Sequence, residues 1–143
     1  MNCRFCTIIN EETERIVAYR EHCFVLLSNP RLVQGHLLVI PRRHVERPGE
    51  LNEEEQKNFF DTVLEFQEYI LSDIASGCDM RQHCKPFLPE SRLKVNHVHM
   101  HLLPREFQDE LYMQTQKEGE VFTELSDQER NHFLTLFRDK KRD

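Results

Sequence analysis

The segment "VNHVHMHLLP", residues 95–104, constrains the fold more than any other part of the chain, because two kinds of residue alternate along it. One kind is apolar and the other is histidine: Val98, Met100 and Leu102 against His97, His99 and His101. Alternate side chains of a β-strand share a face, where neighbours lie roughly 6.5–7 Å apart. The sequence therefore predicts a strand with one apolar face, which a helix can cover, and one face that presents three imidazoles.

Two interpretations of the histidine face stay open at this level. Three neighbouring imidazoles cannot all carry charge cheaply, so their pKa values must spread apart, as acid–base and nucleophilic chemistry requires. The alternative is a row of histidines that pairs with solvent or with polar groups on the next strand. With eight histidines in 143 residues, chance gives such a triplet roughly 0.02 times per chain, which favours a functional role.

Three more strands are predicted upstream of the triad strand, which is expected over about residues 92–103. Residues 15–28 are rich in β-branched and aromatic side chains and form two short strands with a polar turn near residues 20–22. Residues 36–41, "HLLVIP", form an apolar strand that ends at a proline. Between the third strand and the triad strand, residues 75–92 carry two prolines and are interpreted as a loop.

A long helix is predicted after Asn52. This residue is a favourable N-cap with Glu55 three residues on, and apolar residues then repeat at helical spacing. A last helix begins at Ser126, capped against Glu129, and ends in basic residues 140–142. An antiparallel sheet covered by one long helix is an α+β fold.

Length and charge limit the class of protein. A chain of 143 residues is expected to form one domain, residues 1–143, with a C-terminal extension over about 106–143. The net charge of -6 argues against nucleic acid as the main partner, but it does not exclude a small phosphorylated ligand in a local positive pocket. The sequence has no apolar run of membrane-spanning length and no secretory signal pattern, so no membrane partner and a cytoplasmic location are expected.

The five cysteines are an odd number, which favours thiolate chemistry over a disulfide framework. Cys3 and Cys6 form a Cys-x-x-Cys pair, which is a natural half of a tetrahedral zinc site. On spacing alone the remaining ligands stay open among His22, His44 and His83. The alternatives are two ordinary thiols at a frayed end, or a redox pair, which is disfavoured because no helix is predicted directly after the motif.

Other candidate positions are weaker. Cys78, His83 and Cys84 form a candidate for a second metal cluster. His36 follows Gly35 at the start of an apolar strand, where a structural histidine and a phosphate contact are equally expected.

The pattern "HVHMHLL" at 97–103 matches the His-φ-His-φ-His-φ-φ signature of the histidine triad (HIT) family of nucleotide hydrolases and transferases. The segments "CRFC" and "FVLLSNPRLVQGHLLVIPRRH" stand in the family's order, so the resemblance covers about the first 105 residues. It implies an α+β meander with a five-stranded antiparallel sheet, one long helix and a C-terminal helix. It also implies a homodimer.

The resemblance assigns roles to the histidines. His99 would attack the α-phosphorus of a nucleotide, and water would then hydrolyse the nucleotidyl-histidine intermediate. His101 would hydrogen-bond a phosphate oxygen and help to protonate the leaving group, and His36 would contact the phosphates. Zinc-bearing members use the Cys pair, the histidine of the "RRH" segment and the first triad histidine. The implied ligands of one structural zinc per chain are Cys3, Cys6, His44 and His97, the last of which also belongs to the catalytic triad.

The sequence departs from the family in two places. Ser28 stands where an Asn or Asp usually holds the ribose hydroxyls, and Arg92-Leu93-Lys94 replaces the usual Gly-Gln-Ser/Thr segment. Lys94 or Arg92 would supply positive charge instead and so favour a longer, more anionic polyphosphate, although strand parity places Lys94 on the face opposite the histidines. Arg105 is a candidate for outer phosphates.

These features predict a hydrolase of dinucleoside polyphosphates such as diadenosine tetraphosphate. The alternatives are a nucleoside phosphoramidate hydrolase and a nucleotide-binding regulatory protein with little turnover. A sugar-phosphate nucleotidyltransferase is disfavoured, because those members of the superfamily usually carry Gln where His101 stands.

Overall fold

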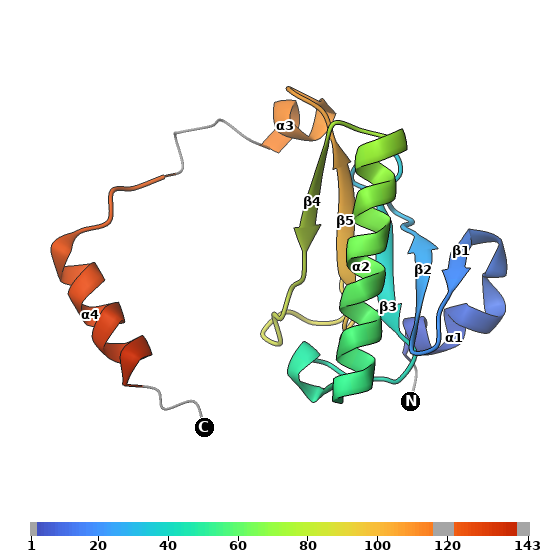
Figure 1. Ribbon diagram of the computed structural model, residues 1–143, viewed down its shortest axis with the longest axis horizontal. Coiled ribbons are helices and arrows are strands. Elements are labelled where there is room, and N and C mark those ends of the chain that lie inside the picture. The colour runs from blue at the N-terminus through green and yellow to red at the C-terminus, as the bar shows by residue number, and fades with distance from the viewer. Residues whose placement is uncertain (1–2, 116–121, 140–143) are drawn as a thin grey trace.

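The computed structural model describes residues 3–115 and 122–139 and contains a five-stranded antiparallel sheet (Figure 1). The strand order is β1-β2-β3-β5-β4. The strands are β1 Ile16–Tyr19, β2 Cys23–Leu27, β3 Leu37–Pro41, β4 Gly77–Arg81 and β5 Met100–Arg105. The predicted α+β class with a five-stranded antiparallel sheet is therefore confirmed.

The helices are α1 Arg4–Glu11, α2 Glu53–Asp73, α3 Glu110–Thr115 and α4 Asp127–Arg138, with short 3₁₀ turns η1 Thr13–Arg15 and η2 Pro48–Glu50. The capping box predicted for the long helix is present at the start of α2. The Asn52 side chain accepts from the Glu55 amide at 2.9 Å, and the Glu55 carboxylate accepts from the Asn52 amide at 3.1 Å. None of the helices in the described ranges is long and apolar enough to cross a membrane.

Helix α2 lies across one face of the sheet (Figure 1) and closes the main core. The face that it covers presents alternate residues of three strands, which pack against the apolar side of the helix: Val25, Leu37, Val39, Leu102, Phe59, Val63, Phe66 and Ile70. Val98 and Met100 join this core, as the alternation in the triad segment predicted. The histidines therefore belong to the opposite side of the sheet.

Within residues 3–115 and 122–139, helices cover the opposite face of the sheet only at its two ends. Phe5 and Ile8 of α1 pack there against Leu26 and Leu38 of the central strands. At the other end, Leu111 of α3 packs against Leu103 of β5 together with a loop valine. Between α1 and α3 the face stays open, and His101 faces that gap because it pairs directly with Leu38.

Two strands differ from the prediction. Residues 77–81 form strand β4 within the segment interpreted as a loop, where polar residues interrupt the apolar pattern. The triad strand was expected over about 92–103, but β5 begins at Met100 and continues past Pro104 to Arg105. Pro104 is tolerated because the pairing of β5 with β3 ends at Leu102, so that from there on β5 pairs only with β4.

The termini also differ in part. A helix, α1, begins at Arg4 directly after Cys3, so the expectation that no helix follows the cysteine motif is wrong. The last helix is confirmed, with Ser126 accepting from the Glu129 amide at 3.1 Å. The predicted basic end at residues 140–142 lies outside the described residues.

Candidate active site and metal centre

Four side chains from three separate parts of the chain converge at one end of the sheet. The ligand atoms of Cys3, Cys6, His44 and His97 all lie within 4.8 Å of one another. Tetrahedral zinc holds sulfur at about 2.3 Å and nitrogen at about 2.0 Å, which places ligand atoms about 3.3–3.8 Å apart. The His97 Nδ1 atom lies 3.4 Å from Cys3 Sγ, 3.6 Å from Cys6 Sγ and 3.3 Å from His44 Nδ1. The group can therefore hold a metal ion.

His97 is oriented for such a site by its second ring nitrogen. Its Nε2 lies 2.7 Å from the carbonyl oxygen of Pro41, which can only accept a hydrogen bond. Nε2 therefore carries the proton, and Nδ1 presents its lone pair to the two thiols and to His44. Without a metal the Cys6 thiol keeps its proton, because burial, the hydrogen bond to Cys3 and the charge of Cys3 raise the pKa of Cys6 to about 11.

The middle histidine of the triad is held in one tautomer. His99 Nδ1 donates to the backbone carbonyl of His97 at 2.7 Å, so the lone pair of the neutral ring is on Nε2. The ring of Phe5 packs edge-on against it, with centroids 5.0 Å apart. Burial lowers the pKa of His99, and the hydrogen bond to His97 opposes this shift. At neutral pH the geometry favours an unprotonated nitrogen on His99.

A chain of hydrogen bonds fixes the tautomer of the third histidine. The Leu32 amide donates to His36 Nδ1 at 3.1 Å, so a neutral His36 carries its proton on Nε2. That Nε2 lies 2.9 Å from His101 Nδ1, which must then accept. His101 is left with a proton on Nε2 as a hydrogen-bond donor. Burial lowers the pKa of His36 to about 4 and that of His101 to about 3, so both rings are neutral at pH 7.

A glycine allows the close packing around His36. Gly35 has φ +78°, and a Cβ atom at this position would lie 3.2 Å from the Cγ atom of Pro104. The conformation and the contact both favour glycine. The backbone directly before His36 is therefore tight.

The open part of the sheet face forms a cleft with two lobes. Lobe 1 has a volume of about 330 Å³ and lobe 2 a volume of about 700 Å³. Apolar side chains from α1 and the sheet line lobe 1, together with four arginines: Phe5, Leu26, Leu38, Arg4, Arg15, Arg31 and Arg92. The two lobes share five lining residues, His83, Leu93, Val95, His99 and His101. The two lobes thus meet at the catalytic candidates.

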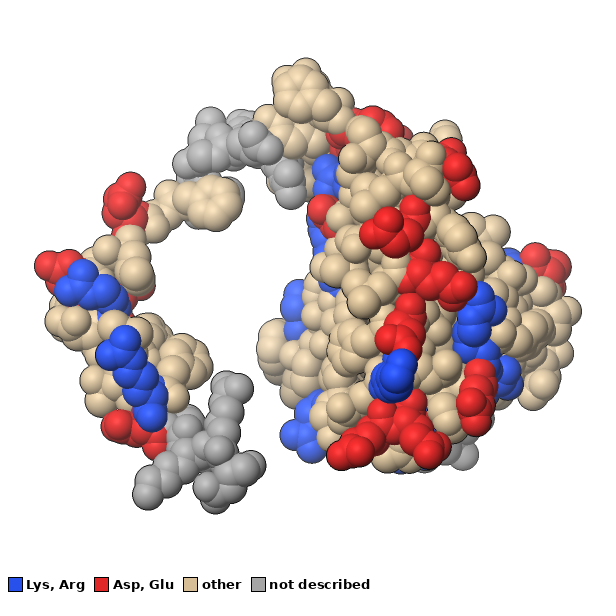
Figure 2. Space-filling model, in the orientation of Figure 1, with Lys and Arg blue, Asp and Glu red and all other residues tan. Residues whose placement is uncertain are grey.

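The cleft and the opposite side of the sheet differ in charge. Lobe 1 has four arginines and no carboxylate among its lining residues. Acidic side chains instead gather along α2 (Figure 2), which begins with Glu53, Glu54 and Glu55. Although the net charge of the chain is negative, lobe 1 is therefore a locally positive pocket, as a phosphorylated ligand requires.

A family model described as the HIT domain matches residues 10–108, which is more than half of the chain. The chain belongs to the HIT family. An uncharacterized HIT-like protein from Methanocaldococcus jannaschii is 36% identical over 105 residues, which are 72% of this chain and 78% of that protein.

Solved HIT structures share the fold. The crystal structure of a HIT family member from Bacillus subtilis has a TM-score of 0.77 at 23% identity, over 100% of this chain and 99% of that one. A histidine triad nucleotide-binding protein from Candida albicans has a TM-score of 0.71 at 20% identity, over 96% and 94% of the two chains.

Two further predicted contact residues of this HIT protein line the cleft. Ser28 lies in lobe 1, where its hydroxyl donates to the carbonyl oxygen of Pro30 at 2.8 Å. Lys94 lies in lobe 2, where its ammonium group donates to the Leu88 carbonyl at 2.6 Å. Strand parity does not apply to Lys94, because the chain turns between Ser91 and Lys94 and the strand begins only later.

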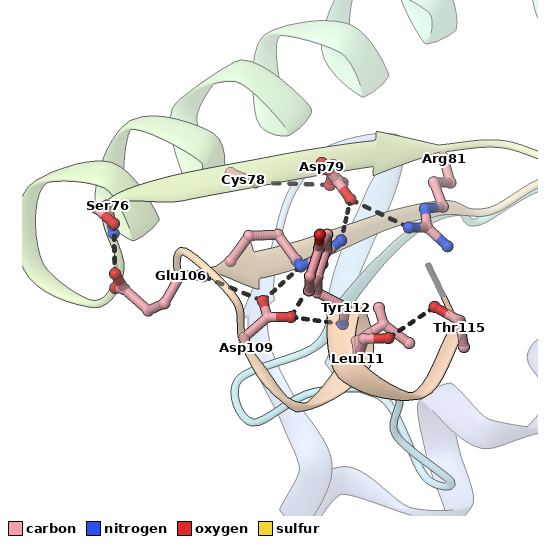
Figure 3. A network of polar contacts seen from close by, with 10 residues as sticks. Ser76, Cys78, Asp79, Arg81, Glu106, Asp109, Leu111, Tyr112 and Thr115 are labelled. Carbon is pink, nitrogen blue, oxygen red and sulfur yellow. Dashed lines mark hydrogen bonds and ion pairs between the residues drawn. The ribbon is translucent and has the colours of Figure 1, made fainter. Parts of the chain in front are cut away.

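Arg105 does not reach the cleft, in contrast to the predicted contact with outer phosphates. It lines neither lobe, and its guanidinium donates to Asp109 and to Asp79, both at 2.6 Å. Figure 3 shows these two carboxylates, with Arg81 beside Asp79. The hydrogen bond from Arg105 holds the pKa of Asp109 well below its usual range. Arg105 therefore ties β5 to β4 and to the start of α3.

We expect Arg105→Leu to lower the free energy of unfolding by roughly 2 kcal/mol at pH 7, because Asp109 loses its partner and Asp79 keeps only Arg81. The pKa of Asp109 is depressed in the folded state, so this stabilisation is present above a pH of about 4 and is lost as the pH falls further. Urea unfolding at pH 7 and at low pH measures both. Lys57→Leu, which breaks the exposed pair with Asp61, is the matched control and should change stability little. A larger effect of the control would contradict the assignment.

One cleft residue, His83, was predicted from the sequence to belong to a metal site. His83 was a candidate ligand of either metal site, but it lies outside the four-residue cluster, as does His22. Among the described residues, Cys78 and Cys84 also form no metal-binding group with it. Its ring instead lies beside His101, with centroids 5.4 Å apart. Only an assignment of strand β4 would have placed His83 at the cleft.

Proposed function

We propose that this HIT protein hydrolyses dinucleoside polyphosphates, with His99 as the nucleophile. The observation that carries the proposal is the two-lobed cleft whose lobes meet at His99 and His101. A substrate with a nucleoside at each end of a phosphate chain needs two binding regions on either side of the reacting phosphorus. The name of the Candida albicans neighbour, a nucleotide-binding protein, supports nucleotides as ligands.

The two lobes suit different parts of the substrate. Lobe 1 offers an apolar wall for a base, the Ser28 hydroxyl for a ribose, and arginines for the phosphates next to it. Lobe 2 continues past the triad toward Lys85 and Lys94 and would take the leaving polyphosphate with its nucleoside. The nucleotide in lobe 1 would be transferred to His99.

The chemistry follows from the tautomers. His99 Nε2 attacks the α-phosphorus, so a P–N bond forms while the P–O bond to the leaving phosphate breaks. His101 Nε2 carries a proton and donates a hydrogen bond to a phosphate oxygen, while the polyphosphate leaves as an anion that needs no added proton. Water then attacks the same phosphorus, the P–N bond breaks with the neutral His99 ring as leaving group, and the water proton passes to the solvent. His36 holds His101 in its donor tautomer throughout.

The proposal assigns one zinc ion per chain to Cys3, Cys6, His44 and His97. Two thiolates and two imidazoles are the ligand set of structural zinc, and four protein ligands leave no position for substrate. The ion would join the N-terminal segment to the end of β3 and to the triad segment. Phe5, between the two cysteines, would then be fixed against His99.

A homodimer in the cytoplasm completes the proposal, with residues 1–143 as one domain. Exposed apolar side chains on α4, such as Phe133 and Phe137, are compatible with an interface. Light scattering of the purified protein should give twice the chain mass. A monomer at micromolar concentration would exclude the dimer but would not contradict the proposed mechanism at His99.

The substrate class is tested with diadenosine tetraphosphate and an adenosine phosphoramidate. Both substrates deliver the same adenylyl group, so they differ only in the leaving group. We expect kcat/KM to be at least about 10-fold higher for the tetraphosphate, because only its leaving group fills lobe 2. A preference for the phosphoramidate would make the protein a phosphoramidate hydrolase. Tight binding of both without product release would indicate a regulatory nucleotide-binding protein.

A further inference from the structure

His83 adds a fourth imidazole to the cleft, next to the triad. It lies two residues beyond Arg81, which pairs with His101 across strands β4 and β5. Paired residues of neighbouring strands share a face, so Arg81 lies on the histidine side of the sheet. His83 follows the end of β4, and two observations place it on the same side: its ring packs at 61° to the ring of His101, and it lines both lobes of the cleft.

His83 differs from most other cleft residues because it lies at the junction of the two lobes. Of the five residues that line both lobes, two are the apolar Leu93 and Val95 and two are His99 and His101. His83 is therefore the one polar side chain of the described residues that reaches both lobes without belonging to the triad. A phosphate chain that passes from lobe 1 to lobe 2 has to pass it.

The ring nitrogens of His83 are available to a ligand. In the other cleft histidines a ring nitrogen is hydrogen-bonded within the protein, as in His36, His99 and His101. No described residue is hydrogen-bonded to a ring nitrogen of His83, whose only bond is through its backbone carbonyl to Gln82. The His83 side chain is exposed and faces the cleft, so an imidazole without a protein partner at this position is suited to donate to a substrate oxygen.

The surroundings of His83 define the ligand. Burial lowers the pKa of its ring, and the nearby charges of Lys85 and Arg81 lower it further. His83 therefore acts as a neutral hydrogen-bond donor within a positive surround, and this combination favours a phosphate oxygen. Lys85 lines lobe 2 together with Lys94 and Arg47, and these three cations outnumber the two carboxylates of the lobe, Glu46 and Glu50. The phosphate concerned is therefore on the leaving-group side.

We propose that His83 is a specificity-determining residue that hydrogen-bonds the leaving phosphate chain at the entrance to lobe 2. This inference rests on the proposed function and adds to it the residue that selects the leaving group. An amine leaving group has no phosphate at this position and gains nothing from His83. A polyphosphate leaving group is both held and stabilised as its charge develops.

The test compares His83→Ala with wild type on two substrates that share the adenylyl group. We expect kcat/KM for diadenosine tetraphosphate to fall by about 10-fold or more, and that for the phosphoramidate to change less than about 2-fold. His83→Gln, which keeps an N–H donor, should recover part of the loss. His22→Ala is the matched control, because His22 lies near Glu54 of α2 and lines neither lobe. Equal losses on both substrates, or no loss on the tetraphosphate, would overturn the proposal.

A binding measurement separates this inference from the proposed function. Calorimetry needs no turnover, so ATP and AMP can be titrated into wild type and into His83→Ala. ATP carries the leaving phosphates, and we expect its affinity for the variant to fall by about 10-fold while that of AMP is unchanged. If wild type hydrolyses neither substrate but this split is found, the proposed function fails and the role of His83 stands. If both substrates are hydrolysed and ATP affinity is unchanged, the role of His83 is refuted.

Discussion

Replacement of His99 by glycine should abolish hydrolysis of diadenosine tetraphosphate, with kcat lower by at least about 1,000-fold. The reason is the fixed tautomer: the Nδ1 proton is donated to the His97 carbonyl, so Nε2 alone can attack phosphorus. Neither His36 nor His101 offers an equivalent nitrogen, because the Nδ1 atoms of both accept hydrogen bonds and their Nε2 atoms carry the protons. Product release, followed by chromatography of AMP and ATP, measures the loss.

The covalent intermediate gives a second readout for the same variant. With substrate labelled at the α-phosphorus, wild type quenched in alkali should retain label, because a P–N bond to histidine survives base and is cleaved by acid. His99→Gly should retain none. His132→Gly, on the exposed surface of α4, is the matched control and should behave as wild type. Equal turnover by His99→Gly and wild type would exclude the mechanism.

Local patterns predicted the parts of the fold that local physics determines. The capping box of α2 is encoded by Asn52 and Glu55 alone, and both hydrogen bonds are present. The alternation of histidine and apolar residues in the triad segment also predicted correctly which side chains face the helix, since Val98 and Met100 contribute to the core under α2. Such features depend on a few adjacent residues and hardly on the rest of the chain.

Strand β4 shows where local patterns do not suffice. Its sequence "GCDMR" has no apolar alternation, and its residues are only partly buried. The strand is held by its pairing with β5 and by the ion pair of Asp79 with Arg105. Because these partners are distant in sequence, neither β4 nor the position of His83 beside His101 could be predicted from the chain alone.

The metal cluster could be predicted only in part from the spacing of its residues. The Cys3 and Cys6 pair was apparent from spacing, yet spacing alone left His22, His44 and His83 as equal partners. Only tertiary structure brings His44 to within 3.5 Å of the Cys6 sulfur. The choice of ligands is therefore decided by chain topology, which the family resemblance supplied and composition could not.

The second large effect is expected when the proposed zinc ligands are replaced. Metal analysis of the purified protein should find about one zinc per chain, and Cys3→Ser combined with Cys6→Ser should lose it. We expect the double variant to lose at least about 3 kcal/mol of unfolding free energy, because the bound ion stabilises only the folded cluster. Urea unfolding with a parallel zinc assay measures both quantities.

Cysteines outside the cluster provide the control for this double variant. Cys78→Ser combined with Cys84→Ser removes the same number of thiols, but neither residue belongs to the cluster, so the zinc content should stay near one per chain. Turnover separates the two double variants as well. Without the ion, Phe5 is no longer fixed against His99, and kcat should fall in the cluster variant alone. A stable wild type that contains no metal after purification without chelators would refute the zinc site and leave the His99 mechanism intact.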